Sequence, residues 1–274
     1  MISAASEPKV IHNLGLKLNL PQTLDFPMSK YLSRTSYDLA YDHTPGTDVC
    51  VIFCSGFNST KQGNKARFLE QTCLENGWEY VRFDYSGHGE SGGDFADCTV
   101  STWIADTQAI IDEIAQNRQV VVVGSSMGGW IALHAALSRP SRVQGLILIA
   151  CAADMTKFYP ERLQGLELRR DAKDRYFYRV PNSYDNEEDY FIYQALIDDG
   201  ETHMLLDNSI PIDVPVRLLH GELDDVVAWD RSVAVLERLE SKDVRFELIK
   251  GGDHRLSTAP DLMSLVRNLK EVIG

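Results

Sequence analysis

The stretch Val120–Gly129 limits what this chain can fold into more than any other part of the sequence. It opens with consecutive valines, and an uninterrupted β-branched run is typical of a strand buried on both faces in a parallel sheet. A Gly-x-Ser-x-Gly motif follows at 124–128 with Ser126 at its centre, and residues 130–137 then have helical spacing. A strand, a sharp turn and a helix in this order are the context in which the motif indicates a nucleophilic serine.

Each residue type in this motif has a physical reason. Ser126 is expected in a strained turn that exposes its hydroxyl above the sheet edge. Gly124 and Gly128 are expected where strand and helix nearly touch, because a Cβ would collide there. The free N–H groups at the helix N-terminus would stabilise negative charge on a substrate oxygen. The alternative is a Gly/Ser-rich turn that only joins a core strand to a core helix.

Buried strands and amphipathic helices alternate through most of the chain. The expected strands are 49–54, 78–85, 120–123, 143–150, 214–220 and 244–249. The expected helices are 63–76, 100–115, 130–137, 229–239 and 260–273. This alternation predicts an α/β fold, with a mostly parallel sheet covered by helices on both faces. Functional groups should then lie at the C-terminal ends of the strands.

An interruption of this alternation at 153–212 predicts a small helical cap inserted between two strands of a single domain, 1–274. The segment is rich in aromatic and charged residues and is broken by prolines. Most of its aromatic side chains would form the cap's own core, and a minority would line an acyl-binding groove. Earlier in the chain, 30–41 is expected to form an antiparallel hairpin. Residues 1–28 are expected to be an N-terminal extension, either an edge strand or a segment packed on the domain.

Charge and composition narrow the choice of partners. The formal net charge of −13 argues against nucleic acid or an anionic membrane, because their phosphates would be repelled. The sequence has no apolar run of about 18 residues, so no integral membrane segment is expected. The five cysteines are scattered without a Cys-x-x-Cys pair, which favours buried thiols in a reducing compartment over a zinc or redox site. Neither a metal nor an organic cofactor is expected, and the oligomeric state stays open.

A serine nucleophile needs a base, and a histidine base needs a carboxylate that fixes its tautomer. After a strand–turn–helix motif of this type, the chain order is serine, acid, histidine. Among the seven histidines, His254 alone lies at a C-terminal strand end beyond both Ser126 and an acidic loop. His254 is therefore the expected general base, and an ordinary loop histidine is the alternative.

The acid is expected in the loop after the first strand that follows the cap. It is Asp224 or Asp225, and Gly221, Asp224 and Val227 match a Gly-x-x-Asp-x-x-Val pattern, which favours Asp224. Asp225 is expected to be a solvated charge or a hydrogen-bond anchor of the turn, and Glu222 to lie at the surface.

Other histidines are weaker candidates. His134 lies two turns along the helix that follows Ser126 and is expected to pack against its neighbours. His220 ends a strand and could touch the site, but it precedes the acidic loop. His88 lies in a glycine-rich loop and is expected to be only a turn residue.

The tetrahedral intermediate of acyl transfer needs two N–H donors that stabilise its oxyanion. One is expected to be the amide of Met127, directly after the nucleophile. The other is expected in the loop 55–57 after the first long strand, from the amide of Phe57. Loss of one such donor typically costs about 3 kcal/mol of transition-state stabilisation.

These residues resemble the α/β-hydrolase superfamily of serine hydrolases over about 48–273, through the 124–128 motif, the segment 84–91, the Asp224 loop and His254. A closer similarity is to the subgroup of palmitoyl-protein thioesterases and acyl-glucuronide esterases. The segments that carry it are 83–87, 124–130, 217–221, 224–229 and 253–255. The resemblance implies an α/β-hydrolase fold and hydrolysis of acyl thioesters or carboxylic esters, with Ser126 as nucleophile, His254 as base and Asp224 as orienting acid.

Two positions depart from the pattern of many relatives. Ser55 stands where a histidine is usual before the oxyanion loop glycine, and Ala228 stands where a proline usually follows the acid loop. The expected substrate is an S-acylated protein or a small acyl ester. One group of alternative functions uses the same three residues for another reaction: carboxylesterase, monoglyceride lipase, peptidase or C–C bond hydrolase. The other alternative is a module of the same fold that binds ligands without turnover.

The N-terminal sequence bears on the cellular location. The eukaryotic enzyme that this chain resembles is mitochondrial, whereas this N-terminus lacks both an Arg-rich transit segment and the basic and apolar regions of a signal peptide. We therefore expect a cytoplasmic location.

Overall fold

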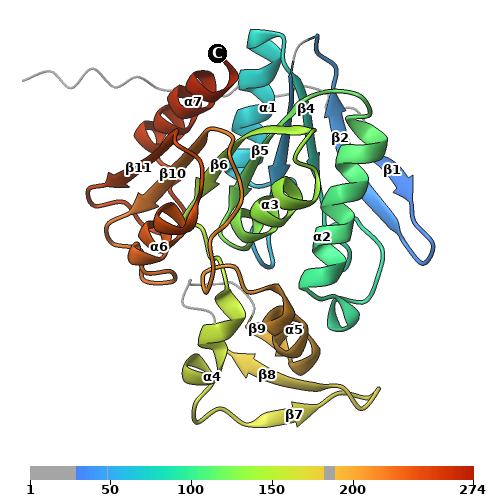
Figure 1. The fold of residues 1–274 in the computed structure, drawn as a ribbon. Helices are drawn as coiled ribbons and strands as arrows, with labels where there is room; N and C mark the ends of the chain where they lie inside the picture. The colour runs from blue at the N-terminus through green and yellow to red at the C-terminus, as the bar shows by residue number, and fades with distance from the viewer. Residues whose placement is uncertain (1–28, 48, 182–188) are drawn as a thin grey trace, which may run out of the picture.

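A computed structural model describes residues 29–47, 49–181 and 189–274. The predicted N-terminal extension, 1–28, lies outside the described residues. The described chain forms a main body around a large sheet, and a smaller part that lies below it in Figure 1 and comes from the predicted cap.

An eight-stranded sheet runs through the main body in the order β1-β2-β4-β3-β5-β6-β10-β11. The strands from β4 to β11 in this order pair in parallel with their neighbours. Their bounds are β3 (Cys50–Cys54), β4 (Glu79–Phe83), β5 (Val120–Ser125), β6 (Val143–Ile149), β10 (Val216–Gly221) and β11 (Val244–Ile249). The prediction of a mostly parallel sheet is confirmed.

The predicted N-terminal hairpin extends this sheet at one edge. The strands β1 (Lys30–Ser33) and β2 (Asp38–Thr44) pair in antiparallel orientation. Strand β2 also pairs antiparallel with β4, so the hairpin continues the hydrogen-bonded sheet.

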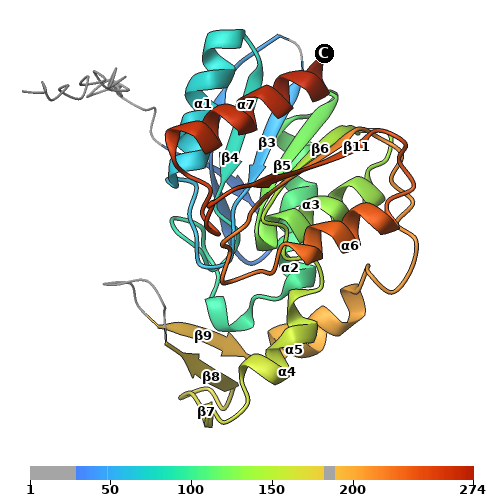
Figure 2. The ribbon, with the colours of Figure 1, turned by 90° about the vertical axis from the view of Figure 1, so that its left-hand side faces the viewer.

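Helices cover both faces of the sheet, as the view in Figure 2 shows. One face carries α1 (Asn64–Asn76) and α7 (Ala259–Ile273), and the other carries α2 (Val100–Ala109), α3 (Met127–Ser138) and α6 (Asp230–Arg238). Val120 and Val122 of β5 belong to the core shared with α2 and α3. Val121 and Val123 belong to the core shared with α1 and α7. The valine run is uninterrupted because β5 is buried on both faces.

The predicted helix 100–115 changes its geometry partway along. It consists of α2 followed directly by a π-helical turn, η2 (Ile110–Ile114). Trp103, Ile110 and Ile111 are fully buried, in agreement with the expectation that this segment is an amphipathic helix. Apolar spacing identified the buried face but not the wider turn.

The cap holds three strands as well as helices, which the prediction of a helical cap missed. Its helices are η3 (Met155–Phe158), α4 (Tyr159–Arg162), α5 (Gln194–Gly200) and η4 (Glu201–His203). Its strands β7 (Leu168–Arg170), β8 (Tyr176–Val180) and β9 (Tyr190–Tyr193) form an antiparallel sheet. Tyr178 and Ile192 are opposite each other on β8 and β9, and both pack with the core of the main body. In strands this short, the alternation of apolar and polar residues covers too few positions to be recognised among the charged residues.

Polar contacts attach the cap to the main body. Arg175, in the turn between β7 and β8, has its Nη1 atom 2.9 Å from an Asp94 carboxylate oxygen and 2.8 Å from an Asp97 oxygen. The Asp199 carboxylate of α5 accepts hydrogen bonds from the amide and hydroxyl of Ser101 at the start of α2, at 2.8 and 2.6 Å. These contacts join two separate parts of the cap to the region around α2.

Two further sequence expectations concern the membrane and the cysteines. Within the described ranges, no helix is both long enough and apolar enough to cross a bilayer. All five cysteines are buried free thiols, in agreement with the prediction that they act as small apolar residues.

Candidate active site

Ser126 occupies the turn between β5 and α3. Its backbone has φ 55° and ψ −119°, a conformation that L-residues rarely adopt. Its N–H donates to the Ile149 carbonyl of β6 at 2.8 Å, and its carbonyl accepts from the amides of Gly129 and Ala152 at 2.9 and 3.1 Å. These hydrogen bonds hold a strained backbone at the C-terminal end of β5, as expected for an exposed nucleophile turn.

The two glycines of the motif permit a close approach of backbone segments. A Cβ on Gly128 would lie 2.1 Å from the Cys54 carbonyl oxygen at the end of β3. A Cβ on Gly124 would lie 2.3 Å from the Gly128 carbonyl oxygen. Any side chain at either position would push β5, α3 and β3 apart, so the turn requires glycine there.

Ser126, His254 and Asp224 are in direct contact, although they are far apart in the sequence. His254 Nε2 lies 3.1 Å from Ser126 Oγ, and His254 Nδ1 lies 2.7 Å from Asp224 Oδ2. The three residues follow the C-terminal ends of β5, β11 and β10 respectively. The Asp224 side chain is 0% exposed and that of His254 is 14% exposed, so solvent reaches the imidazole but not the carboxylate.

The Asp224 carboxylate is hydrogen-bonded through both oxygens. Oδ1 accepts from the amides of Val226 and Val227 at 2.9 and 2.8 Å. Oδ2 lies 2.7 Å from His254 Nδ1 and 3.0 Å from His220 Nε2. Burial raises the pKa of Asp224, but hydrogen bonds from His220 and His254 outweigh burial and hold this pKa well below its usual range. The carboxylate is therefore ionised at neutral pH.

The neighbouring acidic residues take other positions. Asp225 is exposed, and it is Asp224 that contacts His254. Glu222 accepts a hydrogen bond from the Gly251 amide at 3.0 Å and pairs with Lys250. Glu222 thus joins the acid loop to the loop that carries His254.

The amides of Met127 and Phe57 come from the two segments that border Ser126. Met127 is the first residue of α3, where a backbone N–H has no acceptor within the helix. Phe57 follows β3, and a Cβ on the preceding Gly56 would lie only 3.4 Å from the Cβ of Ser126. Both predicted oxyanion donors therefore belong to backbone next to the serine.

His88 does more than the turn residue that the sequence predicted: it holds the loop next to Phe57 in place. Its Nε2 atom accepts a hydrogen bond from the Asn58 amide at 3.3 Å, and Asn58 itself has a positive φ of 55°. Its Nδ1 atom donates to the Ser86 carbonyl at 3.1 Å, since a carbonyl oxygen can only accept. Burial lowers the pKa of His88, which favours this neutral form. His88 thereby fixes the turn that presents Phe57.

Aromatic side chains gather around Phe57 at the junction between the main body and the cap. The ring of Phe57 lies 5.5 Å from Phe95, 6.0 Å from Trp103 and 6.1 Å from Tyr190, measured between ring centroids. Tyr190 belongs to the cap, so both parts of the chain contribute to this apolar cluster.

His220 is the residue that sequence reasoning undervalued. It precedes the acid loop, but its side chain is fully buried and contacts Asp224. The spacing of four residues between His220 and Asp224, just after a buried strand, is the signal that could have identified it. His134, by contrast, packs as expected, with its ring 6.1 Å from Trp130 and 5.2 Å from His203.

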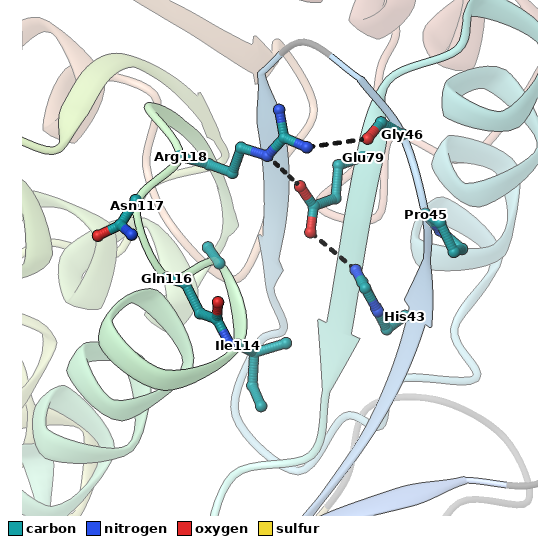
Figure 3. A pocket seen from close by; sticks show the side chains of 9 residues that line it. His43, Pro45, Gly46, Glu79, Ile114, Gln116, Asn117 and Arg118 are labelled. Atoms are coloured by element: carbon teal, nitrogen blue, oxygen red, sulfur yellow. Dashed lines mark hydrogen bonds and ion pairs between the residues drawn. The ribbon is translucent and has the colours of Figure 1, made fainter.

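A pocket of about 570 Å³ lies at the N-terminal ends of the sheet strands, opposite to the C-terminal ends at which Ser126 lies (Figure 3). Its Glu79 carboxylate lies 2.8 Å from His43 Nε2 and 3.2 Å from Arg118 Nε. Glu79 begins β4 and Arg118 precedes β5, so this pocket is at the N-terminal strand ends, away from Ser126. In the part of the chain that the structure describes, no group of three or more His, Cys, Asp or Glu side chains could hold a metal ion.

Sequence comparison identifies the class of protein that this fold and site define. Residues 46–189 match the family described as serine aminopeptidase, S33. A mouse relative named palmitoyl-protein thioesterase ABHD10, mitochondrial, is 40% identical over 89% of this chain and 82% of its own length. The human relative of the same name is 39% identical over 86% of this chain and 76% of its own length.

Solved structures agree with this assignment. Mouse α/β hydrolase domain-containing protein 10 superposes with a TM-score of 0.80 and 36% identity, covering 90% of this chain and 98% of its own. A putative hydrolase from Agrobacterium vitis S4 superposes with a TM-score of 0.82 and 30% identity over the same shares. The chain belongs to the α/β-hydrolase superfamily, and it is a hydrolase.

The names of the relatives correct the expected cellular location. The bovine, mouse and human relatives are all named mitochondrial. This finding overturns the expectation of a cytoplasmic location. That expectation was drawn chiefly from the N-terminal sequence.

The partly buried position of His134 predicts a pH dependence of stability. Burial lowers the pKa of His134 to about 4, below the ordinary value of 6.5 that it regains on unfolding. Between these values the unfolded chain binds more protons, so the free energy of unfolding falls as the pH drops from 6.5 toward 4. His134→Gln, which cannot titrate, should remove roughly 2–3 kcal/mol of this fall in urea unfolding at several pH values. Identical pH dependence in both proteins would contradict the prediction.

Proposed function

We propose that this protein hydrolyses acyl thioesters or carboxylic esters through an acyl-enzyme formed on Ser126. The observation that carries the proposal is the continuous contact from Asp224 through His254 to Ser126, at 2.7 and 3.1 Å. It provides an acid, a base and a nucleophile in the order that serine catalysis requires.

The tautomer of the neutral His254 ring follows from the charge of the acid. An ionised Asp224 carboxylate can only accept a hydrogen bond, so Nδ1 of His254 carries the proton. Nε2 is then free to accept the Ser126 hydroxyl proton. The proposed role of Asp224 is to fix this tautomer and to stabilise the imidazolium that forms during the reaction.

During acylation, one proton moves first from Ser126 to His254 and then from His254 to the leaving group. Ser126 Oγ attacks the acyl carbonyl carbon while its proton moves to His254 Nε2. The oxyanion of the tetrahedral intermediate accepts hydrogen bonds from the amides of Phe57 and Met127. The bond to the leaving sulfur or oxygen then breaks, and His254 gives its proton to the leaving group. Water, activated by the same imidazole, releases the acid and restores Ser126.

The surroundings of Phe57 favour a substrate with an apolar acyl group. The rings of Phe95, Trp103 and Tyr190 lie within 5.5 to 6.1 Å of the Phe57 ring, beside the proposed oxyanion donor. The thioesterase named in the mammalian relatives acts on palmitoyl-protein. We infer that the substrate is an S-acylated protein or a small acyl ester.

The role of Ser126 is tested by Ser126→Ala, with Ser125→Ala as the matched control. The first substitution should lower kcat for an activated acyl thioester by at least about 10⁴-fold and abolish labelling by a phosphonate probe. Ser125 ends β5 and lies outside the proposed proton transfer, so its alanine variant should keep both properties. Labelling of the Ser126→Ala protein at the wild-type rate would remove this residue from the mechanism.

A substrate panel tests the proposed chemistry against its rivals. Thioesters and oxygen esters with a common acyl group should have a higher kcat/KM than the matching peptide. Within the thioesters, each methylene that the apolar cluster buries should raise kcat/KM about fourfold. Preference for the peptide would favour the aminopeptidase activity named in the matched family. Absence of any product burst with an activated ester would instead indicate a module that binds without turnover.

A further inference from the structure

His220 lies directly behind the carboxylate of the proposed triad. It belongs to β10, and its side chain is 0% exposed. Its Nε2 atom lies 3.0 Å from Asp224 Oδ2 and 2.9 Å from the Val227 carbonyl oxygen. Its Nδ1 atom lies 2.7 Å from the hydroxyl of Ser232, which is also fully buried.

The partners of this ring settle which nitrogen donates. The carbonyl oxygen of Val227 and the ionised carboxylate of Asp224 can only accept, so Nε2 of His220 carries a proton. This N–H donates to the Val227 carbonyl oxygen at 2.9 Å, and Asp224 Oδ2 lies 3.0 Å from the same nitrogen. In the neutral ring, Nδ1 then accepts a hydrogen bond from the Ser232 hydroxyl. The resulting chain runs from Ser232 through His220, Asp224 and His254 to Ser126.

One carboxylate oxygen therefore serves two imidazoles. Asp224 Oδ2 lies within hydrogen-bond distance of both His220 Nε2 and His254 Nδ1, while Oδ1 is occupied by two backbone amides. A donor on Oδ2 partly neutralises the negative potential that Asp224 exerts on His254. It also fixes the plane of the carboxylate, and with it the orientation of the His254 ring.

We propose that His220 is a positioning residue that orients Asp224 and, through the shared Oδ2 atom, keeps His254 in its basic, neutral form at lower pH. This inference rests on the proposed function of the triad. Without the His220 N–H, the full charge of Asp224 would stabilise the His254 imidazolium, so the base form would be lost at a higher pH.

Other charged groups around His254 come from its own loop and from α1. Asp253 and Arg255 flank it in sequence, and Lys65 of α1 donates to the Arg255 carbonyl. Burial lowers the pKa of Lys65 to about 8, so this lysine changes charge on the alkaline side of neutrality. These groups are the same in all variants at position 220. A change in the acidic limb of the profile of kcat/KM against pH therefore reports the effect of His220 alone.

The experiment compares His220→Phe, which removes all polar contacts of the ring, with His220→Gln, whose amide N–H can replace the donor to Oδ2. The Phe variant should lose about 10- to 100-fold in kcat for an acyl thioester, with KM little changed. The acidic limb of its kcat/KM profile should move up by about 1 pH unit. The Gln variant should return the limb close to the wild-type position and recover most of kcat.

His43→Phe is the matched control for loss of a partly buried histidine–carboxylate contact. His43 Nε2 lies 2.8 Å from Glu79 in the pocket at the N-terminal strand ends (Figure 3). This variant should lower the melting temperature without moving the acidic limb. Ser232→Ala provides a second route if the Phe variant does not fold, because it frees Nδ1 of His220 and should move the limb in the same direction by less.

A readout independent of turnover separates this inference from the proposed function. In ¹⁵N NMR, the pH midpoint of the His254 imidazole should rise in the Phe variant and return in the Gln variant, whether or not the protein hydrolyses a given substrate. An unchanged midpoint and limb in the Phe and Ala variants, or equal loss of kcat in the Phe and Gln variants, would overturn the positioning role. If the wild-type protein hydrolyses none of the substrates, but the pH midpoint of His254 still rises in the Phe variant, only the proposed function would be overturned.

Discussion

The contact between Gly128 and the backbone at the end of β3 is the constraint on which the site depends. With a Cβ at Gly128 excluded by the Cys54 carbonyl oxygen at 2.1 Å, the N-terminus of α3 lies directly against the start of the loop that carries Phe57. Two residues before Gly128 the chain reverses sharply at Ser126, whose φ is 55°. This close approach thus places both proposed oxyanion donors beside the strained turn at Ser126, the proposed nucleophile.

A second close approach brings the acid and the histidine together. Strands β10 and β11 pair in parallel up to Gly221 and Ile249, so the loops that follow them leave the sheet side by side. A Cβ on Gly221 would lie 2.4 Å from the Gly252 carbonyl oxygen, which means that the end of β10 touches the loop that follows β11. Asp224 and His254 then meet within a few residues of that contact. The charge of Asp224 is kept by amide and imidazole donors that offset the cost of its burial.

The sequence was informative where a local pattern corresponds to a local structure. The valine run, the glycines around Ser126 and the order of Ser126, Asp224 and His254 predicted the sheet and the residues that meet at its edge. The three strands of the cap were missed because each has only three to five residues. The contact of His220 with Asp224 was considered but undervalued, because its four-residue spacing from the acid was not used. The contacts of His88 were missed because they depend on how loops from different strands pack.

The central claim is that Ser126 becomes acylated during turnover. Rapid quenching of the wild-type protein with an acyl thioester, followed by peptide mass spectrometry, measures this directly. The account predicts that the peptide containing Ser126 gains the mass of the acyl group within the first turnover and loses it as product forms. Hydrolysis that proceeds with no acyl group on this peptide, or with the group on another residue, would contradict the account.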